Sequence, residues 1–242
     1  MAMETKKEQN LLGYAILGIS LIVAVSIFSF VFYKVRFLEN TITVVGSAKE
    51  KVTSDTVKWT GILQVEAPKA NLSEGYKKIN ENLESVKKFF KENGISEEKL
   101  IIKAPVVETP WCGNSPCETV IVKQEVVLNL NEIEKVQKLE EKSRELVLAG
   151  VNFTTLSLEY FYSALPELRV KLLKEAMKDA KKRAESILEI SGKKLGSLKS
   201  VSVGVVQVLA PNSVEISDWG TYDTSTIEKE VTVTVRATYL LK

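Results

Sequence analysis

The chain has 242 residues and a formal net charge of +2, with acidic and basic residues spread along its whole length. A balance of this kind gives no reason to expect a nucleic acid or a strongly charged partner. The chain also contains no histidine, which removes the commonest general base and the commonest metal ligand. Composition therefore argues against nucleic-acid binding and against the usual histidine-dependent enzyme sites.

Residues 11–33 form the most informative segment, a run without a single charged side chain. A helix of this length, at about 1.5 Å per residue, spans roughly 34 Å, which is enough to cross a hydrocarbon core of ~30 Å. We predict a transmembrane anchor here, with an N-terminal tail over 1–10 and a short linker over 34–40. A signal peptide cleaved near Ala24-Val25-Ser26 and a buried core helix are the alternatives.

The remaining residues, 41–242, alternate between strand-like and helix-like patterns, and we expect them to form one soluble domain. Residues 41–45 and 56–65 have strand character with a polar turn between them, so we expect them to form a hairpin. Apolar residues then recur every three or four positions over 72–90. This periodicity predicts an amphipathic helix that ends at Asn93-Gly94.

A second predicted strand pair, over 101–107 and 119–130, is connected by the loop that holds both cysteines of the chain, Cys112 and Cys117. The Gly-Asn-Ser-Pro turn between the cysteines can bring their Cα atoms within the ~4.4–6.8 Å that a disulfide requires. We favour a disulfide over two free thiols. Disulfides persist mainly outside the cytosol, so we expect an extracytoplasmic domain, periplasmic or extracellular. The count of positive charges around the anchor favours the cytoplasm instead, but long domains translocate largely regardless of charge.

Five further elements complete the domain. They are a helix over 131–149, a strand over 155–162, a helix over 166–191, and two strands over 197–209 and 227–241. In the long helix, Ala176, Ala180 and Ala184 recur every four residues and form a flat stripe on which a sheet face can pack closely. The order ββ, α, ββ, α, β, α, ββ predicts an α+β fold, with antiparallel strands and three main helices packed on one face.

Aromatic residues in two predicted loops are the candidate contacts for an interface or a ligand. Trp111 lies beside the cysteines, and Trp219 and Tyr222 lie in a long loop before the last strand. Long loops that mix aromatic and turn residues are often functional. Burial inside the monomer is the alternative for each of the three.

Several motifs resemble the SIMPL-domain family, also called DUF541 or YggE-like. Residues 175–184 together with 191–196 are similar to its EAxxDAxxxAxxxA…GxxLG signature. The run Ile42 to Gly46 and the helix end Asn93-Gly94-Ile95 are also similar to the family, and Ser54-Asp55 stands where the family commonly has Pro-Asp. The resemblance covers about residues 40–242.

The resemblance implies an exported or membrane-anchored envelope protein, because bacterial members of the family are typically of this kind. Some members are linked to oxidative-stress defence, and some assemble into large ring-like homo-oligomers. We therefore expect a single-span membrane protein that associates with itself and has a structural or stress-defence role. A monomeric envelope module that binds a protein or a cell-wall ligand is the alternative.

An enzyme is not expected. Ser96-Glu97-Glu98-Lys99 matches the S-x-x-K pattern of penicillin-binding enzymes, but the companion S-D-N and K-T-G motifs do not occur in the chain. The sequence also lacks a Gly-rich phosphate loop and a cluster of metal ligands. We predict no catalytic residue, cofactor or metal, and the sequence identifies no small-molecule substrate.

Overall fold

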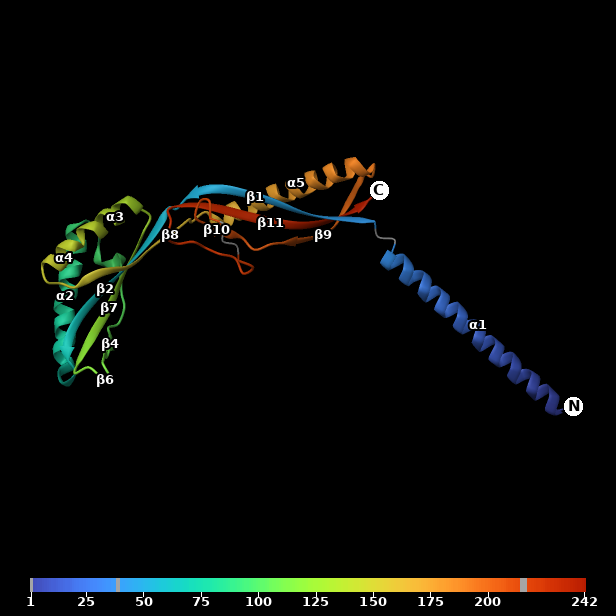
Figure 1. Cartoon of the computed structure of the whole chain (residues 1–242), viewed down its shortest axis with the longest axis horizontal. Helices are drawn as coiled ribbons and strands as arrows, with labels where there is room; N and C mark the ends of the chain where they lie inside the picture. Colours follow the sequence, from blue (N-terminus) through green and yellow to red (C-terminus); the bar gives the residue numbers. More distant parts are fainter. Residues whose placement is uncertain (1, 38–39, 214–216) are drawn as a thin grey trace. The chain divides into compact units, whose positions relative to one another are not determined.

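The computed structural model describes residues 2–37, 40–213 and 217–242 (Figure 1). The chain forms two compact units. The first unit consists of Met1–Gly46, Met177–Val203 and Val235–Lys242, and the second consists of Ser47–Ala176 and Gly204–Thr234. Three long elements contribute residues to both units: β1 (Thr41–Thr53), α5 (Leu165–Ser191) and β11 (Glu228–Leu241).

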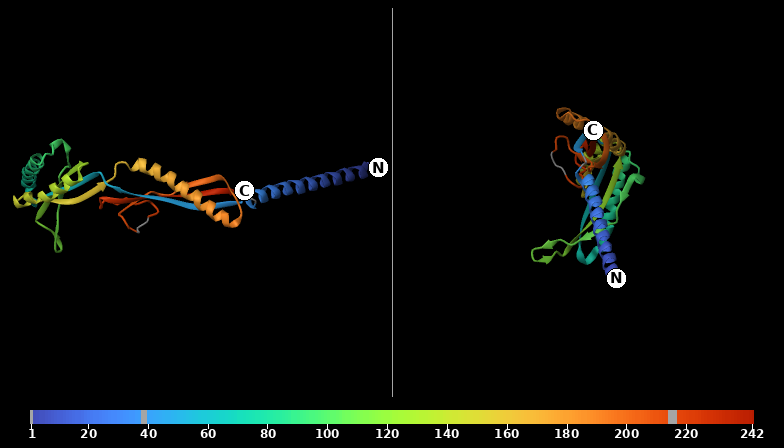
Figure 2. Two further views of the ribbon diagram at one scale, coloured as in Figure 1. Left: turned by 90° about the horizontal axis from the view of Figure 1, so that it is seen from above. Right: turned by 90° about the vertical axis from the view of Figure 1, so that its right-hand side faces the viewer.

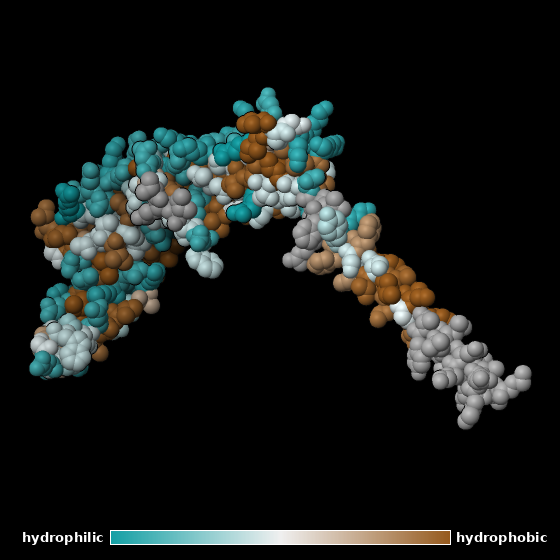
Figure 3. Space-filling model, turned by 45° about the vertical axis from the view of Figure 1, so that its right-hand side comes forward, coloured by the Kyte–Doolittle hydropathy of each residue, from teal (hydrophilic) through white to brown (hydrophobic). Residues whose placement is uncertain are grey.

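The N-terminal helix α1 runs without interruption from Ala2 to Phe37 (Figures 1 and 2). Its window Ile16–Lys34 is long and apolar enough to cross a membrane, and none of that window is buried by the rest of the chain. Phe28, for example, is 70% exposed, and the space-filling view shows a band of apolar residues along this helix (Figure 3). A core helix would be buried, so this exposure is incompatible with that alternative, whereas anchors and signal sequences share the pattern.

One sheet is organised around β11. This strand pairs with β1 on one side and, on the other, antiparallel with β9 (Leu195–Val203) and β10 (Gln207–Leu209). Side chains of β11 alternate along the strand as the period of two requires: Val231, Val233 and Val235 are buried, and the residues between them are not. The predicted alanine stripe of α5 is completely buried at Ala176, Ala180 and Ala184.

The predicted hairpin of residues 41–45 and 56–65 is wrong, because β1 and β2 (Thr56–Pro68) belong to different sheets. Two adjacent residues at their junction bond to different parts of the chain, one directly before β11 and the other at the end of the strand that pairs with β2. The Ser54 N–H donates to the carbonyl of Ile227, 2.9 Å away, whereas the Asp55 N–H donates to that of Phe161, 3.0 Å away. At this polar turn the chain therefore passes from one sheet to the other, and the two strands do not form a hairpin.

The second sheet has the order β3-β7-β2-β8, and the short strand β4 also pairs with β7. Its strands are β3 (Leu100–Ile102), β4 (Val106–Glu108), β7 (Thr119–Leu130) and β8 (Phe153–Phe161). β2 and β7 pair antiparallel without a register shift from Val57↔Leu130 to Pro68↔Thr119. β3 and β4 both pair antiparallel with β7, which confirms the second predicted strand pair.

The hydrophobic core of the second sheet lies under α2 (Leu72–Glu92), α3 (Ile133–Lys142) and α4 (Arg144–Leu148). Trp59, Phe90 and Phe153 meet there edge to face, with ring centroids 5.4–6.3 Å apart. Such a cluster fixes the position of the helices on the sheet, because each aromatic ring buries a large area in a specific orientation. The predicted α+β fold of antiparallel strands and helices is confirmed.

The single helix predicted over 131–149 is instead two helices, α3 and α4, that meet at Ser143. The Ser143 hydroxyl donates to the carbonyl of Glu140, 2.6 Å away, and its N–H bonds to the carbonyls of Leu139 and Glu140. A serine side chain that bonds to the backbone competes with the regular helical pattern. The predicted stop after α4 is confirmed, since Gly150 has a left-handed φ of 85°.

Candidate functional site

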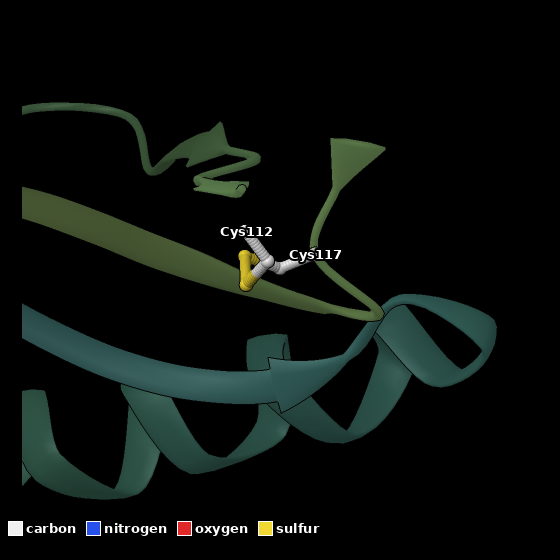
Figure 4. The surroundings of a disulfide bond; sticks show 2 residues. All are labelled: Cys112 and Cys117. Carbon is white, nitrogen blue, oxygen red and sulfur yellow. A yellow bond between two sulfur atoms is a disulfide. The ribbon is translucent and has the colours of Figure 1, made fainter. Parts of the chain in front are cut away.

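The two cysteines form a disulfide at the tip of a small hairpin, as predicted. Cys112 and Cys117 have Cα atoms 5.0 Å apart, and the bond lies on the turn that leads into β7 (Figure 4). The hairpin consists of β5 (Trp111–Cys112) and β6 (Ser115–Pro116), with Trp111 opposite Pro116. The Cys117 N–H also donates to the carbonyl of Pro110, 2.9 Å away. We call residues 108–118 the stapled tip.

Trp111 is the most prominent apolar group of the stapled tip, with 72% of its surface exposed. The disulfide closes a loop of only a few residues, so it restrains the tip far more than it stabilises the fold. An exposed tryptophan on a restrained loop loses little freedom on binding and offers a large apolar area. This combination makes Trp111 a strong candidate for an interface contact.

The other two candidate residues lie in very different environments. Trp219 is 94% exposed, on the loop between β10 and β11. Tyr222 is half-buried: its hydroxyl accepts a hydrogen bond from the Tyr162 N–H, 2.9 Å away, and its ring lies 5.8 Å from that of Phe161. Trp219 is thus available to a partner, whereas the ring and the hydroxyl of Tyr222 are both engaged within the second unit.

Lys229 is completely buried, and the sequence analysis did not single it out. Its ammonium donates to the carbonyl oxygens of Asp223 and Thr226, the latter 2.6 Å away, and lies 5.5 Å from the centre of the Tyr222 ring. Burial lowers the pKa of Lys229, and the nearby Asp223 opposes this effect. The lysine therefore fastens the loop that carries Trp219 to the first residues of β11. In the sequence, Lys229 alternates with Val231 and Val233, and this alternation is the signal that could have placed its side chain on the buried face of β11.

Asp223, on the same loop, is held by its own hydrogen bonds. Its carboxylate accepts hydrogen bonds from the Ser225 N–H, the Ser225 hydroxyl and the Thr226 hydroxyl, each 2.7 Å long. Burial alone would raise the pKa of Asp223, but the hydrogen bonds from Thr226 and Ser225 together hold it below its usual value. Hydrogen bonds among residues 223–229 thus order this part of the loop, and Trp219 lies four positions before it in the sequence.

A cleft of about 870 Å³ opens at the start of α3. Its apolar lining includes Ile133, Leu139 and Ile227, and its basic lining consists of Lys135, Lys138 and Lys142. Pockets of roughly 300–1,000 Å³ with apolar walls and a few polar groups are the usual binding sites of small groups. The volume and lining of this cleft therefore suit a ligand or side chain that has an apolar centre and polar groups around it.

The acidic residues of the cleft are largely engaged. Asp55 accepts hydrogen bonds from Ser163 and Thr56, and although burial alone would raise its pKa, these bonds hold that pKa below its usual value. Glu132 forms an ion pair of 3.6 Å with Lys135. In the part of the chain that the structure describes, neither Lys138 nor Lys142 forms an ion pair with a carboxylate.

The S-x-x-K match of the sequence lies in a polar surface turn. Ser96 is exposed, and its carbonyl accepts a hydrogen bond from the Lys99 N–H, 3.1 Å away. Across residues 2–37, 40–213 and 217–242, no group of three or more His, Cys, Asp or Glu side chains is placed to hold a metal ion.

A family model matches most of the chain. The model of a family described as "SIMPL: Protein of unknown function (DUF541)" matches residues 42–239. This range contains the stapled tip, the cleft beside α3 and the loop that carries Trp219. No curated protein matches the chain.

Proposed function

Because the chain belongs to the SIMPL family, whose model covers residues 42–239, we propose that it is a membrane-anchored protein that assembles with copies of itself. In this proposal α1 is an uncleaved anchor, and the domain that follows it lies on the extracytoplasmic side. The assembly is a ring-like homo-oligomer with a structural or stress-defence role in the envelope, and it has no catalytic activity.

The observation that carries this proposal is the pair of open edges in the sheet around β11. β1 extends over 13 residues and β9 over 9 residues, and each pairs with β11 alone among the strands that the structure describes. The outer backbone groups of an edge strand are a ready template for a strand of another chain. β9 also exposes apolar side chains at Leu198, Val201 and Val203. Contact between β1 of one copy and β9 of the next would use both edges.

Edge-to-edge contact of this type is heterologous, because the two surfaces that meet are different. Heterologous contacts produce a ring when the rotation between neighbours closes, and a filament when it does not. A membrane anchor on every copy favours closure, since all anchors must enter the same bilayer. This geometry supports a ring over an open fibre.

Self-assembly is tested by native mass spectrometry of the full-length protein released from detergent micelles over a range of concentrations. We expect one dominant species whose mass is a multiple of the 27.0 kDa chain. The species should persist on dilution, because closing a ring adds a contact without adding a chain. A monomer at every concentration would exclude the proposed assembly and favour the monomeric binding module.

The membrane side is tested by labelling the cysteines in spheroplasts with a maleimide that does not cross membranes. We expect no labelling before reduction, since Cys112 and Cys117 are joined. After treatment with an impermeant phosphine, both should be labelled in intact spheroplasts. Labelling that requires permeabilised membranes would place the domain in the cytoplasm and overturn this part of the proposal.

A further inference from the structure

The anchor helix ends within a few residues of one end of the first unit. α1 ends at Phe37, and the carbonyl of Asn40 already accepts a hydrogen bond from the Leu241 N–H, 2.8 Å away. Lys194 and Lys242 exchange two further backbone bonds of 3.2 and 2.9 Å, so the start of β9 lies level with the start of β1. Figure 2 accordingly shows the orange end of α5 and the C-terminus at the same end of this unit. The turn between α5 and β9 is therefore tied to the base of the anchor.

The length of the chain limits how far this turn can lie from a bilayer. The apolar window of α1 ends at Lys34, and Asn40 follows six positions later. Three helical residues and three fully extended ones span at most roughly 15 Å. The headgroup layer on one side of a bilayer is about 6 Å thick, and the surface potential of anionic lipids extends about 8 Å beyond it. The turn therefore lies within reach of the membrane surface whenever α1 spans the membrane.

Positive charge is concentrated at this end of the first unit. Residues 34–40 and 189–200 contain five basic and two acidic residues, whereas the whole chain has a net charge of only +2. Lys193 and Lys194 are exposed, and neither forms an ion pair within the described part of the chain. Lys242 adds no net charge, because its carboxylate offsets its ammonium. The basic residues are Lys34, Arg36, Lys193, Lys194 and Lys199, and the acidic ones are Glu39, which lies outside the described residues, and Glu189.

An exposed apolar side chain stands beside this lysine pair. Ile190 is the penultimate residue of α5 and is 91% exposed, whereas Leu188 is buried against the sheet. Gly192 follows with a left-handed φ of 67° and ends the helix. Apolar side chains next to lysines are typical of segments that lie in the interfacial layer of a membrane. The turn thus presents both kinds of group that a membrane surface binds.

We propose that the turn between α5 and β9 binds the anionic phospholipid headgroups of the bilayer that holds α1. Lys193 and Lys194 contact phosphate groups, and Ile190 enters the layer between the headgroups and the acyl chains. This inference rests on the proposed anchor and names the surface through which the anchored domain contacts its membrane. β1 and β9 both begin at this end, so the contact holds these two edges at the same height in every copy.

The test measures hydrogen–deuterium exchange of the full-length protein in two kinds of nanodisc. One contains phosphatidylcholine alone, and the other contains an equal mixture of phosphatidylcholine and phosphatidylglycerol. We expect the peptide that contains residues 191–193 to exchange at least ~10-fold more slowly in the anionic nanodiscs, because each lysine near an anionic surface strengthens binding by roughly 5-fold. Peptides of α2 should exchange equally in both. High salt should remove the difference, since it screens charges near a surface.

A pair of charge variants separates direct contact from mere proximity to a charged surface. The double change Lys193→Glu and Lys194→Glu should exchange at the same rate in both nanodiscs. The matched control is Lys77→Glu with Lys78→Glu, which changes two adjacent exposed lysines of α2. This control alters the total charge equally but away from the turn, so it should retain the slower exchange of the wild-type protein. Circular dichroism verifies the fold of each variant.

The role of Ile190 has its own matched pair, Ile190→Ser and Leu148→Ser. Leu148 is 88% exposed and, like Ile190, stands two positions before a glycine with a left-handed φ, but it lies on α4. We expect Ile190→Ser to speed exchange of the turn in anionic nanodiscs at least ~3-fold, because each buried methylene adds roughly 4-fold to membrane affinity. Leu148→Ser should leave the exchange of the turn unchanged.

The outcomes distinguish this inference from the proposed function. If the full-length protein does not enter nanodiscs, both the anchor and the lipid contact are wrong. If it enters them and the turn of the wild-type protein exchanges equally in both lipids, the contact is wrong and the anchor stands. If the Lys193 and Lys194 double variant keeps the slower exchange, the two lysines do not bind the headgroups. Equal exchange in Ile190→Ser and Leu148→Ser would show that Ile190 does not enter the membrane.

Discussion

Lys229→Ala should lower the free energy of unfolding by about 3–5 kcal/mol, one of the largest single-residue effects that this chain allows. Two causes contribute. The side chain is completely buried, so truncation leaves a cavity. The carbonyls of Asp223 and Thr226 also lose their donor. Natural domains have only ~5–15 kcal/mol of total stability, so denaturant unfolding in mild detergent should detect the change readily.

Two variants make this prediction specific. Lys229→Met retains the length of the side chain but not its hydrogen bonds, so we expect an intermediate loss of about 1–3 kcal/mol. Lys49→Ala is the matched control: Lys49 is on the neighbouring strand and pairs with Glu230 at 3.2 Å, but its side chain is 68% exposed. An exposed pair contributes only about 0–1 kcal/mol. Equal stability of Lys229→Ala and Lys49→Ala would contradict the buried position of Lys229.

The pH dependence of these variants follows from the direction of the pKa shift. Burial lowers the pKa of Lys229 in the folded chain below its ordinary value of 10.5, which the unfolded chain retains. At pH values between these two pKa values, the unfolded chain therefore holds more protons than the folded chain. The free energy of unfolding therefore rises with pH through the alkaline interval below 10.5. Lys229→Met lacks this group, so the wild-type protein should gain stability relative to that variant over the same interval.

Val45→Pro should abolish or strongly reduce self-assembly while leaving the fold intact. β1 and β11 run antiparallel, since the Leu241 N–H donates to the Asn40 carbonyl at one end and the Ser54 N–H to the Ile227 carbonyl at the other. In this register the even-numbered residues of β1 bond to β11, and the odd-numbered residues direct their N–H groups to the open edge. Proline at position 45 thus removes an outward donor and no bond within the sheet.

The matched control for this edge variant is Val45→Thr, which keeps both the N–H group and a β-branched side chain. We expect Val45→Thr to assemble like the wild-type protein and Val45→Pro to appear mainly as monomer in native mass spectrometry. Circular dichroism should be the same for both. Assembly of Val45→Pro at wild-type strength would show that the outer edge of β1 is not part of the interface.

Much of the local structure was predictable because it depends on neighbouring residues. The periodicity over 72–90 locates α2, and the glycines after the helices mark their ends. The turn between Cys112 and Cys117 also brings the two cysteines together without help from the rest of the fold. In these cases the determining interactions lie within a few positions along the chain.

The errors concern interactions between distant residues. β1 pairs with β11, almost two hundred positions away, and no local pattern distinguishes this pairing from a hairpin with β2. The charge of Lys229 argues against a buried position. The side chain is buried nevertheless, because carbonyls of the preceding loop accept its hydrogen bonds. The cleft beside α3 combines residues of four separate segments, among them Asp55 and Ile227, and no contiguous motif marks it.

The central claim is that anchored copies of this chain form a closed assembly, and cryo-electron microscopy of the full-length protein in lipid nanodiscs tests it most directly. We expect class averages of a ring of repeated copies, with the α1 helices together in one patch of bilayer. Particles that each contain a single copy, at concentrations where the protein is intact and folded, would contradict the claim.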